Sequence, residues 1–226
     1  MILYICPMKI AITNLKGGVG KTTIATNLAA ALTQRNKKVC IVDTDLNQHS
    51  SMEWASNRGE ERVHISVFGI MGGQLTTEIK QLREQYEYVI LDGTPHVSEL
   101  AKRTMIVSDL IIIPISPSIY DFRAFEAFLE HLEDVNRNRQ EFGLERAKSL
   151  VVMNRMNERS KIGQQILSAV GHYDVQIMDT RLVNRTAYAD TATDGIGVVE
   201  GKDPKAKSEF NRFTDELESI ISQLKI

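Results

Sequence analysis

Short apolar runs alternate along the whole chain with longer stretches that carry apolar residues at helical spacing. Each short run is continuous in residues such as Val, Ile and Leu, which is typical of a strand buried on both faces of a sheet. The runs predict strands at residues 9–13, 38–42, 64–68, 88–91, 110–115 and 150–153. The stretches between them predict helices at residues 22–34, 75–84, 98–107, 122–138 and 162–170.

This alternation predicts an α/β fold, with a mainly parallel twisted sheet flanked by helices on both faces, because strands joined through helices pair in parallel with right-handed crossovers. No repeat, linker or low-complexity stretch interrupts the 226 residues, so we expect a single domain over 1–226. Residues 1–7 are expected to be a non-native or flexible extension. Ligands of such sheets bind beyond the carboxyl ends of the strands, where we look for the chemistry.

Composition narrows the class of protein only a little. A chain with 42% apolar and 25% charged residues is neither disordered nor fibrous. Its net charge of −2 argues against a protein coated with nucleic acid over its whole surface. Two cysteines are too few for a disulfide framework or a metal cluster, and the longest apolar stretches are far shorter than the roughly 18 residues that span a bilayer. We therefore expect a cytoplasmic protein.

The strongest chemical signal is a glycine-rich segment between the first strand and the first helix, Lys-Gly-Gly-Val-Gly-Lys-Thr-Thr at residues 16–23. Glycines let backbone N–H groups turn inward around a phosphate, and the helix N-terminus adds partial positive charge. Lys21 is expected to contact the β- and γ-phosphates, and the Thr22 hydroxyl to ligate Mg²⁺. The expected nucleotide-binding residues of this loop are Gly17, Gly18, Val19, Gly20, Lys21, Thr22 and Thr23.

The loop also carries a second lysine, Lys16, and has Leu15 where a standard Walker A loop has its first glycine. In this it resembles the deviant Walker A motif of the ParA/MinD group of P-loop ATPases, and the chain is most similar to small plasmid-partition ParA proteins. The resemblance implies an ATPase of weak intrinsic turnover that uses ATP and Mg²⁺. It also implies that Lys16 reaches the partner's nucleotide across a dimer interface and so links ATP binding to dimerisation.

Three aspartates follow predicted strands. The segment with Asp43 and Asp45 resembles the family's Asp-x-Asp-x-x-Gln, which implies that Asp43 approaches the water shell of Mg²⁺ and that Asp45 positions the attacking water. Asp92 ends the strand at residues 88–91 in the Walker B manner and is expected to hold Mg²⁺ through water. By the same resemblance Asn154 contacts adenine. Taken alone, Asp43 or Asp45 could instead be a helix-capping or turn residue, and this is the alternative interpretation.

Basic residues gather in one window of the sequence. Residues 146–185 contain seven basic and three acidic residues, so this window carries +4 and the rest of the chain −6. A solvated polar face is one interpretation, and a DNA-binding surface that a dimer would double is the other. No base-reading motif is evident, so such binding would be independent of sequence. The candidate DNA contacts are Arg155, Arg159, Lys161, Arg181 and Arg185.

Residues 209–226 show an apolar stripe at helical spacing, as a MinD-like membrane helix would. The polar face is acidic, with Glu209, Asp215, Glu216 and Glu218 against Arg212 and Lys225. Anionic lipid would repel such a face. We therefore expect the stripe to pack on the domain, and no membrane partner.

The favoured function is a ParA-type ATPase that forms a homodimer on ATP, binds DNA non-specifically and partitions a plasmid or chromosome. A ParB-like or other cargo adaptor would stimulate hydrolysis, and the protein would associate with the nucleoid. Positioning of a protein microcompartment by the same mechanism is the alternative. A metabolic P-loop ligase is less favoured because no small-substrate motif is evident, and Cys6 and Cys40 are misplaced for the bridging cluster of an iron–sulfur ATPase.

Overall fold

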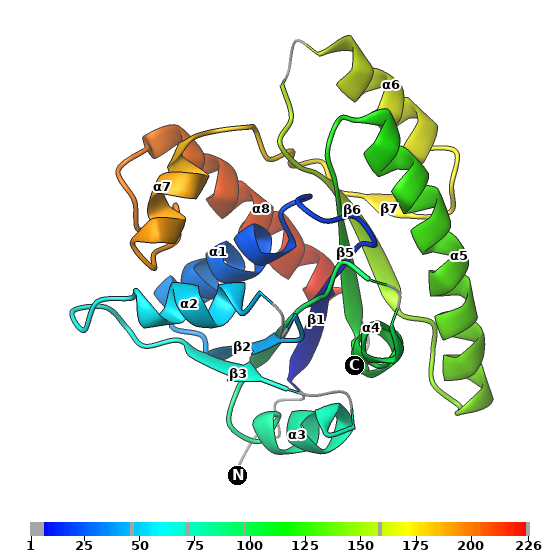
Figure 1. The fold of residues 1–226 in the computed structure, drawn as a ribbon, viewed down its shortest axis with the longest axis horizontal. Helices are drawn as coiled ribbons and strands as arrows, with labels where there is room; N and C mark the ends of the chain where they lie inside the picture. The colour runs from blue at the N-terminus through cyan, green and yellow to red at the C-terminus, as the bar shows by residue number, and fades with distance from the viewer. Residues whose placement is uncertain (1–6, 46–47, 71–72, 97, 158–159, 225–226) are drawn as a thin grey trace.

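A computed structural model describes residues 7–45, 48–70, 73–96, 98–157 and 160–224, and these residues form one seven-stranded sheet in the order β3-β2-β4-β1-β5-β6-β7 (Figure 1). All of its strand pairs are parallel. The strands are β1 (Met8–Ile12), β2 (Val39–Asp43), β3 (Ser66–Gly69), β4 (Tyr88–Asp92), β5 (Leu110–Ile115), β6 (Lys148–Met153) and β7 (Gln176–Ile177). The expected α/β fold with a parallel sheet is confirmed.

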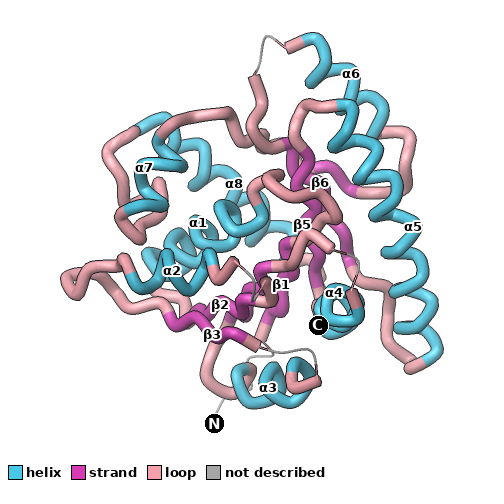
Figure 2. The backbone as a smooth tube through the Cα atoms, in the orientation of Figure 1, coloured by secondary structure: helices cyan, strands magenta, loops and turns pink. Residues whose placement is uncertain are grey.

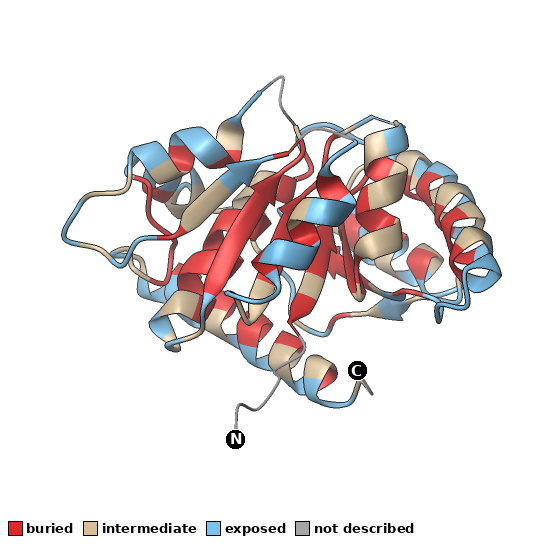
Figure 3. Cartoon of the chain, turned by 90° about the horizontal axis from the view of Figure 1, so that it is seen from below, coloured by how far each residue is buried: buried red, intermediate tan, exposed pale blue. Residues whose placement is uncertain are grey.

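Helices cover both faces of the sheet (Figures 1 and 2). One face packs against α1 (Lys21–Gln34), α2 (Ser50–Ser56), α7 (Ala187–Thr193) and α8 (Pro204–Ser222). The other packs against α3 (Leu75–Leu82), α4 (Glu99–Val107), α5 (Ile119–Glu141) and α6 (Lys161–Val170). The central strands are therefore buried on both sides, as Figure 3 shows.

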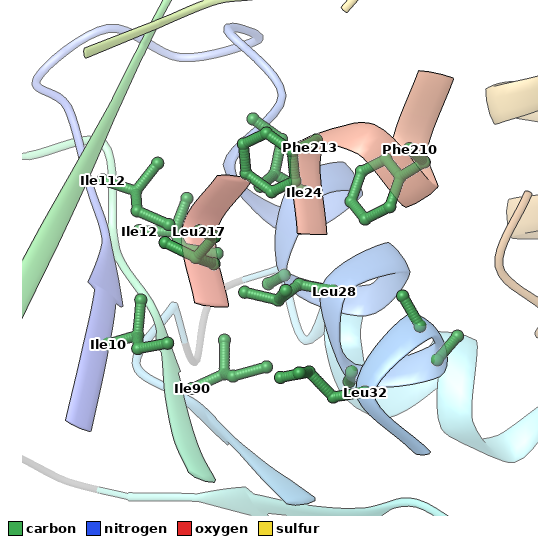
Figure 4. Packing of buried hydrophobic residues seen from close by; sticks show 14 of the residues in the cluster. Ile10, Ile12, Ile24, Leu28, Leu32, Ile90, Ile112, Phe210, Phe213 and Leu217 are labelled. Carbon is green, nitrogen blue, oxygen red and sulfur yellow. The ribbon is translucent and has the colours of Figure 1, made fainter. Parts of the chain in front are cut away.

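The core on the first face is built largely by α1 and α8. Ile24 and Leu28 of α1 lie against Phe213 and Leu217 of α8, and all four side chains are at most 1% exposed (Figure 4). The apolar stripe of α8 is thus used inside the domain, as its acidic polar face had led us to expect. Within the described residues, no helix combines the length and the apolar character needed to cross a bilayer.

One acidic residue that the sequence places on the polar face of α8 does not face solvent. Glu209 is 2% exposed, and its carboxylate accepts hydrogen bonds from the Val183 amide at 3.0 Å and the Tyr188 hydroxyl at 3.0 Å. The sequence placed Glu209 on the polar face because an isolated glutamate is usually solvated. The carboxylate is buried because it joins α8 to Tyr188 of α7 and to Val183 in the loop before α7.

Most predicted elements match the structure to within a few residues, whereas four short or late elements do not. The sequence carried no separate signal for α2, β7 or α7, and the start of α8 at Pro204 lies before the predicted stripe. The helices α2 and α7 have seven residues each and β7 has two, too few for a period to be recognised. The proposed extension at residues 1–7 lies outside the described residues except for Pro7.

Candidate functional site

The glycine-rich loop joins β1 to α1 at the carboxyl edge of the sheet. Two of its glycines adopt a left-handed backbone conformation, with φ 78° at Gly18 and φ 95° at Gly20. Residues other than glycine rarely adopt such angles. A Cβ atom at Gly20 would also lie 2.2 Å from the Asn154 amide nitrogen. This position is therefore restricted to glycine by both backbone conformation and space.

Neighbouring strands brace the loop through two asparagines. The Asn154 amide, after β6, donates to the Val19 carbonyl at 2.7 Å. The Asn14 amide, after β1, donates to the Pro114 carbonyl at 2.8 Å, while its oxygen accepts from the Lys16 amide at 3.1 Å. Asn14 follows the first predicted strand directly, but nothing in the sequence pattern distinguishes it as a residue that holds the loop. These contacts preform the curve of the loop.

The two lysines of the loop differ in their surroundings. The Lys21 side chain is buried, and its ammonium donates to the Lys16 carbonyl at 2.9 Å. Burial lowers the pKa of Lys21, an effect that the nearby carboxylates of Asp92 and Asp45 oppose. The Lys16 side chain is exposed, and within the described residues its ammonium has no hydrogen-bond or ion-pair partner. Lys21 therefore stabilises the loop, whereas the ammonium of Lys16 is available for a contact outside it.

The carboxyl ends of β1, β2 and β4 bring the predicted metal residues together. Asp43 and Asp92 are direct neighbours in the parallel register of β2 and β4. The Thr22 hydroxyl donates to Oδ2 of Asp92 at 2.7 Å, and a residue that the sequence did not reveal, Ser51, donates its hydroxyl to the same oxygen at 2.6 Å. Among the described residues, Oδ1 of Asp92 has no partner, although it is buried. Burial raises the pKa of Asp92 to about 6.

Asp43 is fully buried and lies beside Asp92 in the sheet. Its two oxygens accept from backbone amides, Oδ1 from Asp45 at 2.9 Å and Oδ2 from Ser51 at 3.2 Å. Burial raises the pKa of Asp43 despite these hydrogen bonds. Asp43 thus holds the turn after β2 and the start of α2, while Asp45 is only partly buried.

A cavity of ≈270 Å³ adjoins the phosphate loop on the side of α7. It is lined by Thr23 of α1 and Asn154, and also by Arg155, Arg185 and Tyr188. The Tyr188 hydroxyl donates to Glu209, and burial is the main cause that raises the pKa of this phenol. The position of Asn154 is compatible with a base contact, although its amide nitrogen is already used on Val19.

The candidate DNA contacts do not form one uniform surface. Arg155, Lys161 and Arg181 are exposed. Arg185 forms an ion pair with Glu209 at 3.3 Å, and its side chain is 24% exposed. Arg159 lies outside the described residues. A second cavity, of ≈570 Å³, is lined by Arg155, Arg185 and Lys205, the last of which was outside the basic window.

A parallel sheet of this strand order, with a glycine-rich loop leading into α1 and carboxylates at the ends of β2 and β4, defines a P-loop nucleotide-binding protein. The chain belongs to the CobQ/CobB/MinD/ParA nucleotide-binding domain family, whose model matches residues 10–197. The resemblance to ParA/MinD-type P-loop ATPases is therefore confirmed.

Individual relatives resemble the chain over different lengths. Maintenance of carboxysome distribution protein A of Halothiobacillus neapolitanus is 26% identical over 92% of this chain and 95% of its own length. The chromosome-partitioning ATPase Soj of Thermus thermophilus is 30% identical over 56% of this chain and 62% of its own length. The structure of a Cyanothece McdA variant in complex with ATP superposes with a TM-score of 0.75 at 19% identity, covering 94% of this chain and 97% of that one.

Proposed function

We propose that this protein is an ATP-driven switch of the ParA type, which dimerises on ATP, binds DNA non-specifically in that state, and positions a cargo. A ParB-like or other adaptor on the cargo would stimulate hydrolysis and release the dimer from DNA. The observation that carries the proposal is the exposed ammonium of Lys16, which has no partner among the described residues, on a loop whose other lysine is buried. An ATP-dependent contact with a second copy of the chain requires a cation of this kind, one that is not paired within the described residues of its own chain.

The residues present fit a magnesium ion. Mg²⁺ prefers hard oxygen ligands, and the Thr22 hydroxyl and the Asp92 carboxylate are 2.7 Å apart. The buried Oδ1 of Asp92 has no partner in the described part of the chain, so it is available to a water of the metal shell. Asp43 would act one step further away, since backbone amides occupy both of its oxygens. When bound, the metal supplies charge neutralisation to the phosphates.

The chain's own residues would divide the remaining work. Lys21 would exchange the Lys16 carbonyl for phosphate oxygens, and the backbone amides of the loop would surround the same group. Asp45 would orient the attacking water, because phosphoryl transfer depends mainly on positioning and charge stabilisation. Thr23 and Asn154 would face the ribose and base in the ≈270 Å³ cavity.

The role of Lys16 is tested by Lys16→Ala, with Lys80→Ala on α3 as the matched exposed-lysine control. With ATP and Mg²⁺, wild type and Lys80→Ala should double in mass by light scattering, and Lys16→Ala should stay monomeric while still binding nucleotide. A Lys16→Ala dimer of wild-type stability would refute the proposed switch.

The role of Asp45 is separable from that of Lys16. Asp45→Ala should keep ATP-dependent dimers, because dimerisation needs bound ATP rather than its hydrolysis, but should lose turnover. Phosphate release measured beside light scattering checks both properties on one sample. Unchanged phosphate release would remove Asp45 from the mechanism.

DNA binding would use the exposed cations Arg155, Lys161 and Arg181, and it would place the protein on the nucleoid. The double variant Lys161→Glu with Arg181→Glu, whose residues do not line the nucleotide cavity, should lose DNA retention and keep ATPase activity. Arg83→Glu, at the end of α3, should retain both. Binding through six to ten phosphates should weaken by about 10³–10⁵ between 50 and 200 mM salt. A gel shift that the double variant leaves unaltered would favour a merely solvated face.

Two cargoes remain candidates, each with its own support. One relative that matches nearly the whole chain is named for carboxysome distribution, and the shorter Soj match is named for chromosome partitioning. Removing the protein from its host should cluster protein compartments in the first case and raise the loss rate of a replicon in the second. A P-loop ligase, the less favoured function, would need a small carboxylate substrate for turnover, whereas the proposed switch should hydrolyse ATP without one.

A further inference from the structure

Ser51 joins the two buried aspartates of the site from a third element. It is the second residue of α2 and is fully buried. Its hydroxyl donates to Oδ2 of Asp92 at 2.6 Å, and its backbone amide donates to Oδ2 of Asp43 at 3.2 Å. A single residue therefore links the ends of β2 and β4 to the first turn of α2.

The hydroxyl of Ser51 determines which oxygen of Asp92 is left free. Oδ2 receives both the Ser51 and the Thr22 hydroxyls, whereas buried Oδ1 receives no donor from the described residues. Two hydrogen bonds to one oxygen oppose rotation of the Asp92 carboxylate. Without them, rotation would exchange the positions of Oδ1 and Oδ2. The Asp92 carboxylate is therefore held in one orientation, with Oδ2 hydrogen-bonded and Oδ1 available to a ligand.

We propose that Ser51 is a positioning residue that orients Asp92 toward the magnesium ion of the nucleotide site. The inference rests on the proposed ATP and Mg²⁺ function of that site. Ser51 acts through Asp92 rather than on the metal or the phosphates. Hydrogen-bond partners of this kind, one layer outside the metal ligands, typically change metal affinity or activity by about 10–100-fold when removed.

The far end of α2 is anchored, which keeps Ser51 in register with the aspartates. The Trp54 indole N–H donates to the Ile196 carbonyl at 3.3 Å. Just after the helix, the Arg58 guanidinium forms a buried ion pair with Glu200 at 2.7 Å. These contacts fix α2 against the loop before α8, so the hydroxyl of Ser51 is presented to Asp92 without needing the nucleotide to order it.

The neighbouring serine provides a matched control. Ser50 is the first residue of the same helix, is partly exposed, and has no side-chain hydrogen bond within the described residues. Ser50→Ala removes the same hydroxyl group from the first turn of α2 but breaks no contact with Asp43 or Asp92. Ser51→Thr keeps a hydroxyl at the bridging position and serves as the conservative variant.

The experiment titrates Mg²⁺ against binding of a fluorescent ATP analogue and measures kcat and KM for ATP. For Ser51→Ala we expect the Mg²⁺ concentration at half-saturation to rise about 10-fold and kcat to fall about 10-fold. Analogue binding in EDTA should stay within about twofold of wild type, because Asp92 does not contact the nucleotide without metal. Ser50→Ala should match wild type throughout, and Ser51→Thr should recover most of the Mg²⁺ affinity.

The other outcomes separate the inference from the proposal beneath it. An Mg²⁺ midpoint for Ser51→Ala equal to that of Ser50→Ala overturns the positioning role and leaves the ATPase proposal standing. An equal loss of binding in EDTA also overturns it, since Ser51 would then only support the fold of the pocket. If wild type binds the analogue without any dependence on Mg²⁺, the proposed function of the site fails together with the inference.

Discussion

Asp92→Asn should make the metal-free protein more stable, although it should also abolish function. The Asp92 carboxylate is 1% exposed, and among the described residues its Oδ1 has no partner. Burial raises its pKa from an ordinary 3.8 to about 6, which means that ionising this group costs the folded chain free energy. A neutral amide of nearly the same shape removes that cost.

The magnitude follows from the two pKa values. The difference between 3.8 and about 6 corresponds to about 3 kcal/mol of destabilisation once the carboxylate is fully ionised. The new amide would place an N–H₂ group where Oδ1 now has no partner among the described residues, at a cost of about 1–3 kcal/mol. We therefore expect Asp92→Asn to gain on the order of 1 kcal/mol at pH 8.

The pH dependence is a sharper test than the absolute gain. Because the pKa of the folded state is the higher one, the wild-type penalty grows as pH rises from about 4 to 6 and is constant above that range. The advantage of Asp92→Asn should therefore shrink by about 1–1.5 kcal/mol between pH 8 and pH 5. The cost of the amide cancels in this difference.

The assay is urea unfolding with EDTA at pH 5, 6.5 and 8, using wild type, Asp92→Asn and the exposed control Asp179→Asn. Asp179→Asn controls for the loss of one carboxylate, because Asp179 is exposed in the folded chain. If the advantage of Asp92→Asn over wild type is the same at all three pH values, burial does not perturb Asp92 and the reasoning is refuted.

Three further substitutions test other parts of the structure. Gly20→Ala should abolish nucleotide binding measured by calorimetry, because its Cβ would lie 2.2 Å from the Asn154 amide in a left-handed backbone; retained binding would show that the loop relaxes. Phe213→Ala should lower the free energy of unfolding by about 3–5 kcal/mol, since the ring is fully buried between α1 and the sheet; a loss below about 1 kcal/mol in urea would contradict that packing. Glu200→Ala should cost about 3–5 kcal/mol by leaving the Arg58 guanidinium buried without its partner, and an unfolding midpoint equal to that of wild type would count against this.

The parts of the site that could be predicted from the sequence lie at the ends of strongly apolar strands. Asp43 and Asp92 each end such a strand, and in a parallel sheet the register then sets them side by side. The phosphate loop could be placed for the same reason, since it joins β1 to a long helix. In these cases the local pattern and the tertiary arrangement agree.

The missed parts depend on tertiary contacts that leave no local pattern. Ser51 stands in a seven-residue helix, where a serine is usually a cap rather than a bridge between two aspartates. Glu209 looked like surface charge because burial of a carboxylate depends on donors that come from the loop 26 residues earlier. The ion pair of Arg185 also leaves no local pattern, because its partner is the carboxylate of Glu209.

The packing of α8 on α1 also bears on how the chain is made. The helix that follows the phosphate loop buries its apolar face against Phe210, Phe213 and Leu217, which are synthesised roughly 180 residues later. On the ribosome, α1 and one face of the sheet would stay uncovered until α8 has emerged, even though the other layer has all of its helices. Nucleotide binding is therefore expected to arise as a late event of synthesis, and the nascent chain should present the Ala- and Leu-rich surface of α1 to chaperones until then.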